Sequence, residues 1–300
     1  MRLFHVSALA VVLVVSACGK KEEGAKSDPK AAPSATTTVE APTFTKKAPV
    51  ANQKAEETSK MKMGLTLDVD PTGSGKSVNT TMDTTQDQSR EEEILAVTGD
   101  AITKVKVKYT TLDSSMTEGG KATKEPDPRV GKTYVVSSKD GKVEVLGEDG
   151  KAAVPVEATL VEKDFQRLGK ADPIAAALPA RVLKPGENVP ELADAIKAMM
   201  KSNGGGKDME ISDVTATFKE KSGDEGIFDV ALTLGKADGP MKMSVPLKGE
   251  LHLRTADGQM ASIKLAGPVT VSTNESDPKN KVKMSGKGNM EIEAARKLKS

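Results

Sequence analysis

The sequence predicts an α+β protein in which one large antiparallel sheet, twisted into a half-barrel shape, carries a few helices on one face. Two observations predict this fold. Apolar and polar residues alternate along many short runs, as in strands with one buried and one solvated face. These runs lie on both sides of a helical segment at about 157–202, instead of alternating with helices. A β-sandwich is the alternative architecture.

The first strands are expected between about residues 60 and 156. Alternation is regular from Met61 to Val69 and again from Val105 to Tyr109. Asp140-Gly141 and Asp149-Gly150 follow, and Asp-Gly between alternating runs predicts a hairpin because glycine accepts positive φ. This part of the chain therefore predicts hairpin-connected strands.

Helical spacing replaces the alternation from Glu157 to Leu168, and Gly169 stands where a C-cap is expected. Asp172-Pro173 then offers an N-cap and a proline at the first helical position. Pro190 begins a third helix, which we expect to end at Gly204 to Gly206. One face of this helix is apolar and carries Leu192, Ile196, Met199 and Met200.

Alternation returns at about residue 207 and continues to about 293, through runs that begin at Phe228, Met241 and Ile263. Asp257-Gly258 predicts another hairpin, and Ser222 to Gly226 predicts a longer turn. The resulting order of strands, helices and strands is similar to that of the half-barrel carriers of lipoproteins in the periplasm. That resemblance concerns element order alone and transfers no residue role.

The first eighteen residues have the composition of a secretory leader. Met1-Arg2 gives a positive start, and an apolar run from Leu3 to Val15 is too short to span a ~30 Å hydrocarbon core. Val15-Ser16-Ala17-Cys18 resembles the lipobox of bacterial lipoproteins. The resemblance implies that residues 1–17 are a cleaved signal peptide and that Cys18 carries a diacylglycerol and a further acyl chain such as palmitate. Two or three chains give stable anchoring.

Residue 19 is glycine, not the aspartate that retains such lipoproteins in the inner membrane. The resemblance therefore implies a lipid-anchored protein of the cell envelope, more in keeping with the outer than the inner membrane. Whether it faces the periplasm or the cell surface stays open. Residues 18–59 are expected to be the lipidated cysteine and a disordered linker, because Lys, Glu, Ala, Pro, Ser and Thr dominate them.

Composition argues against several classes of function. A net charge of +1, from 44 basic and 43 acidic side chains, gives no field for nucleic acid. His252 is the one histidine after the leader and Cys18 the one cysteine, so common zinc sites lack ligands. Ser–His or Cys–His catalysis would depend entirely on His252, which lies in the middle of an expected strand with no catalytic motif around it. Glu91 to Glu93 are expected at a solvated strand start or turn. We expect no enzymatic activity, metal, cofactor or nucleic-acid partner.

The expected function is that of a non-enzymatic envelope lipoprotein, held to the membrane by its lipid anchor. Its folded part, residues 60–300, would be a binding or structural module for an envelope protein partner. The alternative is a carrier or binder of lipid, or of another hydrophobic ligand, in a cavity between sheet and helices. The candidate groove residues for that alternative are Leu192, Ile196, Met199 and Met200, since methionines line adaptable apolar grooves.

Overall fold

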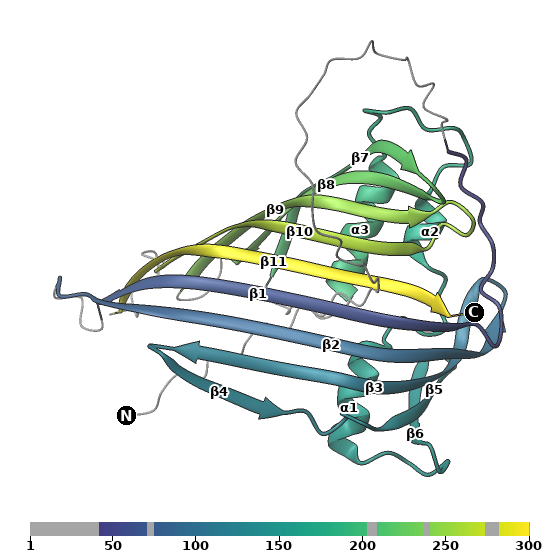
Figure 1. The fold of residues 1–300 in the computed structure, drawn as a ribbon, viewed down its shortest axis with the longest axis horizontal. Coiled ribbons are helices and arrows are strands. Elements are labelled where there is room, and N and C mark those ends of the chain that lie inside the picture. Colours follow the sequence, from purple (N-terminus) through teal and green to yellow (C-terminus); the bar gives the residue numbers. More distant parts are fainter. Residues whose placement is uncertain (1–41, 71–74, 203–208, 237–240, 274–281, 300) are drawn as a thin grey trace, which may run out of the picture.

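A computed structural model describes residues 42–70, 75–202, 209–236, 241–273 and 282–299. The leader, Cys18, the first part of the linker and Gly204 to Gly206 lie outside these residues. Eleven strands form one antiparallel sheet in the order β6-β5-β3-β2-β1-β11-β10-β9-β8-β7, with β4 paired to β3 (Figure 1). Six strands precede the helices: β1 Lys54–Asp70, β2 Val78–Thr98, β3 Ala101–Glu118, β4 Lys121–Pro126, β5 Thr133–Lys139 and β6 Lys142–Gly147.

Three helices follow in the described chain: α1 Pro155–Asp164, α2 Pro173–Ala177 and α3 Pro190–Ser202. The remaining strands are β7 Glu210–Ser222, β8 Glu225–Lys236, β9 Met241–Arg254, β10 Met260–Thr273 and β11 Lys283–Lys299. The prediction of a large antiparallel sheet is confirmed, and strand dominates so strongly that the helices are a minor part of the fold. The sandwich alternative is wrong, because all described strands belong to one sheet.

The centre of the sheet is the pair β1 and β11, which come from opposite ends of the described chain. They pair over their whole length, from Lys54 opposite Lys299 to Asp70 opposite Lys283. This pairing joins the half formed by β2 to β6 with the half formed by β7 to β10. The sheet remains open, with β6 and β7 at its edges.

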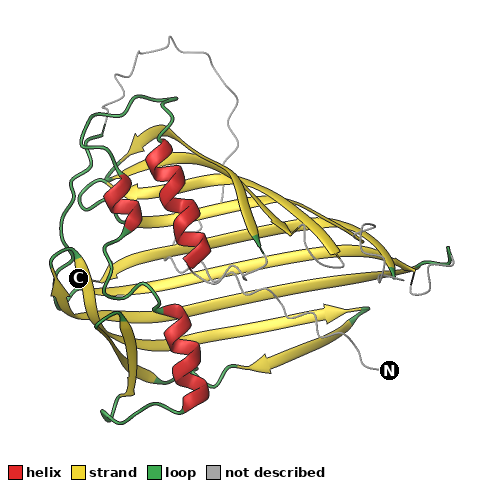
Figure 2. Ribbon diagram, turned by 180° about the vertical axis from the view of Figure 1, so that it is seen from behind, coloured by secondary structure: helices red, strands yellow, loops and turns green. Residues whose placement is uncertain are grey.

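All three helices lie on one face of the sheet, here called the inner face (Figure 2). Helix α3 packs against β7 and α1 against β6, so each covers one edge region. Two apolar cores result. The larger lies under α2 and α3 and includes Phe218 and Phe228, and the smaller lies under α1 and includes Tyr109 and Tyr134.

Local sequence signals account for most element ends. Asp140 and Gly141 both have positive φ (52° and 75°) and form the two-residue loop between β5 and β6, as predicted. Asp172 accepts a hydrogen bond from the Ile174 N–H and caps α2, also as predicted. Ser222 pairs directly with Glu225, so the longer turn expected there is a two-residue loop.

One predicted hairpin and one predicted helix end are wrong. Asp149-Gly150 forms a turn, but only an isolated bridge between Leu146 and Ala152 follows it, and then α1 begins. Helix α1 ends at Asp164 instead of Leu168. The chain leaves the helix there because Phe165 turns into the small core and stacks on the Arg90 guanidinium, 4.8 Å from its ring centroid.

The folded part also begins before residue 60, contrary to the predicted linker. Strand β1 starts at Lys54, and Phe44 is buried against Phe228, with ring centroids 5.8 Å apart. The polar composition of this stretch concealed the order. The burial of Phe44 and the pairing of β1 with β2 and β11 hold it.

A diagonal line of three glycines bends the sheet: Gly249 on β9, Gly267 on β10 and Gly288 on β11. Gly249 pairs with Leu265, two residues before Gly267, and Gly288 stands two residues before Met290, the partner of Gly267. A Cβ at these positions would overlap the carbonyl oxygens of Lys264, Pro246 and Gly64 respectively. Only glycine permits this close approach of neighbouring strands, and glycine kinks of this kind give a sheet its curvature.

The outer face of the sheet is charged and solvated. Cross-strand ion pairs cover it, including Lys60 with Asp87 (3.2 Å) and Lys219 with Glu250 (2.6 Å). Among the described helices, none has the length and apolar character needed to cross a membrane.

Candidate functional site

The inner face changes from charged to apolar along its central strands. The inward side chains of β1 are, in order, Ala55, Glu57, Ser59, Met61, Met63, Leu65, Leu67 and Val69. On β2, opposite them, Glu92, Arg90, Gln88, Gln86, Thr84 and Met82 follow the same trend. Two regions therefore share the same strands, a charged end beside α1 and α2 and an apolar end beyond the helices.

At the charged end, four side chains from three adjacent strands form a buried ionic cluster. Arg90 Nη2 lies 2.8 Å from Glu57 Oε2 and 2.7 Å from Glu92 Oε1. Arg296 Nη1 lies 2.8 Å from Glu57 Oε1, and its Nη2 lies 3.7 Å from Glu92 Oε2. The cluster thus ties β2 to both β1 and β11 at the middle of the sheet.

Helix α1 joins the same cluster through its last residue, Asp164. Asp164 Oδ2 accepts hydrogen bonds from the Tyr109 hydroxyl (2.6 Å) and from Arg129 Nη1 (2.7 Å), and it lies 3.8 Å from Arg90 Nη1. Arg129 is held in turn by Asp127, at 2.8 Å. The smaller core and the centre of the sheet therefore meet at one carboxylate.

The two glutamates of the cluster have opposite electrostatic behaviour. Burial acts to raise the pKa of Glu57, but Arg90, Arg296 and their hydrogen bonds outweigh it, so the pKa lies below its usual range. Burial also raises the pKa of Glu92, and there the attraction of Arg90 does not compensate, partly because Glu57 is a like charge. Glu57 is thus the carboxylate that keeps its charge, and Glu92 is the one that holds a proton more readily.

Some buried polar atoms of the cluster have no hydrogen-bond partner among the described residues. They include Arg90 Nη1, Arg296 Nε and Glu92 Oε1. The Glu92 oxygen lies within ion-pair distance of Arg90 without the angle of a hydrogen bond. Buried polar atoms cost free energy unless water or another polar group meets them.

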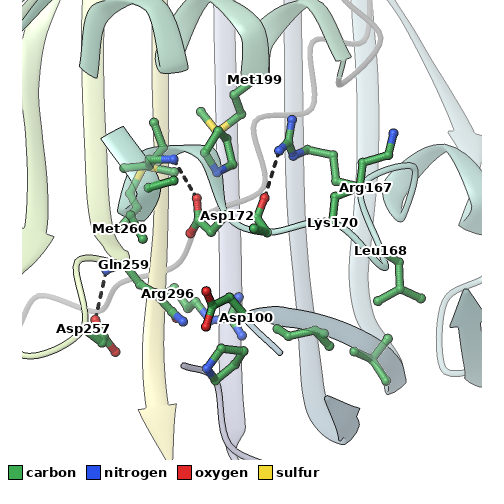
Figure 3. Close-up of a pocket in the computed structure, with 18 of the residues that line it drawn as sticks. Asp100, Arg167, Leu168, Lys170, Asp172, Met199, Asp257, Gln259, Met260 and Arg296 are labelled. Carbon is green, nitrogen blue, oxygen red and sulfur yellow. Dashed lines mark hydrogen bonds between the residues drawn. The ribbon is translucent and has the colours of Figure 1, made fainter. Parts of the chain in front are cut away.

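A cavity of about 320 Å³ adjoins the cluster, between the ends of β1, β2 and β11 and the segment that leads into α2 (Figure 3). Its walls are mixed: apolar side chains come from α2, α3 and β10, and charged ones come from the cluster and the rim. In Figure 3, Met199 and Met260 lie on one side of the space and Arg296 and Asp100 on another. An apolar wall beside a few convergent polar groups is the usual character of a small-ligand site.

Beyond the helices, half-buried apolar side chains continue along the inner face and are called the apolar strip. It crosses six adjacent strands, from β3 to β9, which at ~4.8 Å per strand is roughly 24 Å. Its members are flexible or branched aliphatic side chains, and the neighbouring Lys62, Asp83 and Lys242 point to the outer face. The strip consists of Met63, Leu67, Val69, Met82, Met116, Met243, Val271 and Met284.

The four predicted groove residues on α3 do not line an open groove. Leu192, Ile196 and Met200 are almost completely buried in the larger core, where side chains of the sheet fill the space against them. Met199 alone among them lines the cavity. The correction follows from helical geometry, because the apolar face of α3 is the face that packs on the sheet.

The ionic cluster is absent from the sequence-based predictions. Glu91 to Glu93 were expected in solvent, and Glu91 and Glu93 do point outward and pair with lysines. Glu92 points inward and is buried. A usable signal existed, since Glu57 shares the alternation phase of Met61 and Met63, so a strand extended toward the N-terminus would place its carboxylate inside.

His252 lies on the outer face, as expected for a partly solvated strand residue. Its Nδ1 is 2.9 Å from Glu225 Oε2 and its Nε2 is 3.5 Å from Glu250 Oε2. Within the described chain, no group of three or more His, Cys, Asp or Glu side chains is arranged to hold a metal ion.

Comparisons with known proteins give no family for this chain. No family model and no curated protein matches it. Among solved structures, a lipovitellin structure described by its lipid–protein interactions is similar at a TM-score of 0.34 and 7% identity. That match covers 82% of this chain but 25% of lipovitellin, so the chain spans about a quarter of that protein.

Two further structures have lower similarity. DynF from the dynemicin biosynthesis pathway of Micromonospora chersina has 10% identity and a TM-score of 0.17, covering 89% of this chain and 92% of its own. The translocator domain of the autotransporter NalP from Neisseria meningitidis has 9% identity and a TM-score of 0.17, covering 82% and 88%. At these TM-scores none of the similarities supports a functional argument.

Proposed function

We propose that this protein is a non-enzymatic, lipid-anchored module of the bacterial cell envelope that binds a long-chain amphiphile, such as a membrane lipid, on its inner face. One observation supports the proposal above all: the gradient from charged to apolar side chains along β1, β2 and β11. An amphiphile has the same gradient along its own length, so one molecule would match both ends of the face.

The apolar end has suitable dimensions for an acyl chain. From Met63 to Val69 the strip extends over roughly 20 Å at ~3.3 Å per residue. One leaflet of a ~30 Å hydrocarbon core is about 15 Å thick, so a chain from a lipid fits within the strip. Methionine side chains are well suited to such contact because they adapt their shape to the ligand.

The charged end offers a different environment. The cavity beside the cluster has guanidinium and carboxylate groups with unpaired atoms, so a polar headgroup there would gain hydrogen bonds that the closed protein lacks. The outer face, in contrast, carries ion pairs across its strands and would stay in water. The outer face of the sheet would therefore be solvated, and the inner face would bind the ligand.

A native mass spectrometry experiment tests the binding. The full chain carrying Cys18→Ser is incubated with vesicles of phosphatidylethanolamine and phosphatidylglycerol, separated from them and weighed. We expect one lipid per chain. Leu67→Glu, which puts a charge in the strip, should reduce bound lipid by at least ~10-fold, the equivalent of about 1.4 kcal/mol.

The matched control is Thr66→Glu, the neighbouring outward-facing position, which should leave binding unchanged. Lipid-free protein in every form would overturn the proposal. Equal loss in both variants would place the lipid somewhere other than the inner face.

The anchor has a test of its own. Cys18→Ser should abolish incorporation of labelled palmitate and release the protein from the membrane fraction, because the acyl chains on Cys18 are the proposed stable attachment to the bilayer. Undiminished labelling of that variant would contradict the lipoprotein assignment. It would not affect the proposal of a ligand site on the inner face.

A further inference from the structure

A short segment at the N-terminal edge of the described chain closes one side of the cavity. This segment, residues 42–53, is called the strap. It runs past the ends of the sheet strands from β8 toward β1 (Figure 1). Lys46, Lys47, Ala48 and Pro49 line the cavity from the strap, and Lys46 Nζ donates a hydrogen bond of 2.9 Å to the Ala176 carbonyl at the end of α2.

The strap is held mainly at its two ends. At the first end, Phe44 is buried, and Thr45 N–H donates a 2.9 Å hydrogen bond to the Thr255 carbonyl. At the second, Asn52 N–H donates to the Ile94 carbonyl at 2.7 Å, and the Ile94 N–H donates to Gln53 at 2.9 Å. The second end continues directly into β1, so it is fixed by the whole β1–β2 pairing.

The first end rests on a small socket for Phe44. The ring lies over Gly226, where even a Cβ would overlap its Cζ atom, and packs beside Phe228 at 5.8 Å. Between the two ends, residues 45–48 are exposed, and Val50 is 66% exposed. Phe44 is thus the large apolar side chain that holds the first end of the strap, together with the buried Pro42 two residues before it.

We propose that the strap is a releasable cover over the cavity and that Phe44 in its glycine socket holds it closed. This inference concerns regulation of the site and rests on the proposed function for its purpose. Release of one ring frees a peptide that otherwise contacts the cavity through short or solvated side chains. The strand pairing at the other end keeps the opened strap attached to β1. In the sequence, the proposed anchor Cys18 stands 24 residues before the strap.

Thiol labelling tests the cover without any ligand. Cys18 is the one cysteine in the sequence, so the full chain carrying Cys18→Ser and Met199→Cys has a single thiol inside the cavity. Its reaction with a maleimide is measured with Phe44 present and with Phe44→Ala. We expect at least ~10-fold faster labelling after Phe44→Ala, because a deleted buried ring lowers the free energy of local opening. Gly226→Ala, which displaces the ring without deleting it, should act in the same direction.

Val107→Cys, buried in the smaller core, is the control for general unfolding. Its labelling should stay unchanged by Phe44→Ala. Equal labelling of Met199→Cys with and without Phe44 would overturn the cover, and so would an equal acceleration at Val107→Cys, since opening would then be global.

The lipid experiment separates the two proposals. Faster labelling in a protein that binds no lipid keeps the cover and removes the proposed function. If the protein binds lipid but Phe44→Ala does not change the labelling rate, the proposed function is supported and the cover is contradicted.

Discussion

At one end of the inner face, β1 presents Glu57 to two arginines in a site closed to solvent. Four residues further along, the same strand presents Met61, and beyond it the inward Met63, Leu67 and Val69 are partly open. The contacts of the charged end depend on exact geometry, since each guanidinium lies within ion-pair distance of particular carboxylate oxygens. The apolar end is adaptable, since methionine and leucine accept many neighbours. One face thus combines a fixed end with an adaptable end, and the proposed amphiphile would contact both.

The two ends also differ in what they contribute to stability. In a buried ion pair, the attraction between the two charges offsets the free energy lost when both are removed from water, so the pair adds little net stability. Loss of one partner is costly, because the other charge stays buried and unpaired. Burial of apolar surface contributes in proportion to area and needs no partner. Substitutions should therefore have sharp effects at the charged end and graded effects at the apolar end.

The largest expected effect is that of Glu57→Gln. It would leave Arg90 and Arg296 buried with Glu92 as their remaining carboxylate within the four-residue cluster, and should lower the free energy of unfolding by about 3–5 kcal/mol. Urea denaturation of the variant checks this. Glu56→Gln, on the outer face one residue away, should change stability by less than about 0.5 kcal/mol. Similar small effects for both would mean that the cluster is not closed to solvent.

Next in size is Gly288→Val, in the bend of the sheet near the apolar end. The new side chain would meet the Gly64 carbonyl of β1, and relief of that overlap should cost about 3 kcal/mol of stability. Thermal unfolding measures the loss. Asn289→Val, exposed on the same strand, is the control and should lie within about 0.5 kcal/mol of the parent protein. Equal stability losses for the two variants would show that the bend does not depend on glycine.

The smallest expected effect is on pH dependence. The pKa of Glu92 is raised on folding, so the folded state binds more protons than the unfolded one between the usual pKa of 4.5 and the higher folded value. Stability contributed by this group is therefore complete at acid pH and falls as pH rises through that window. Glu92→Gln should therefore gain stability relative to the parent protein as pH rises through that window. Glu57 has the opposite sign, because its lowered pKa gives stability that is lost as pH falls.

Denaturation curves at several pH values from 4 to 8 would show the Glu92 difference growing with pH. A constant difference between Glu92→Gln and the parent protein would show that Glu92 does not titrate in this range. Substitutions in the apolar strip that preserve charge, such as Met63→Leu, should show no pH dependence of their effect.

Sequence reasoning found the elements with strong local signals. The alternation from Met61 to Val69, the Asp140-Gly141 loop and the Asp172 cap are determined by neighbouring residues, and each is where it was predicted. The order of strands in the sheet was beyond reach, because the pairing of β1 with β11 joins residues more than 200 positions apart. Phe44 was missed for a similar reason, since its socket at Gly226 exists only after folding.

The candidate site was predicted least well. Hydrophobic periodicity correctly marked the apolar face of α3, but it does not distinguish a face that packs on a sheet from one that lines a groove. The ionic cluster draws on β1, β2, β11 and α1, so no local window contains it. Its one local sign is Glu57 in phase with Met61.

Photo-cross-linking tests the central claim most directly. A fatty acid with a diazirine in its chain is bound to the full chain carrying Cys18→Ser, activated by light, and its attachment points are mapped by mass spectrometry. We expect attachment to inward residues of the apolar strip, chiefly Met63, Met82 and Met284, and none to the outward Lys62 or Thr66. Attachment to the outer face, or scattered equally over both faces, would contradict it.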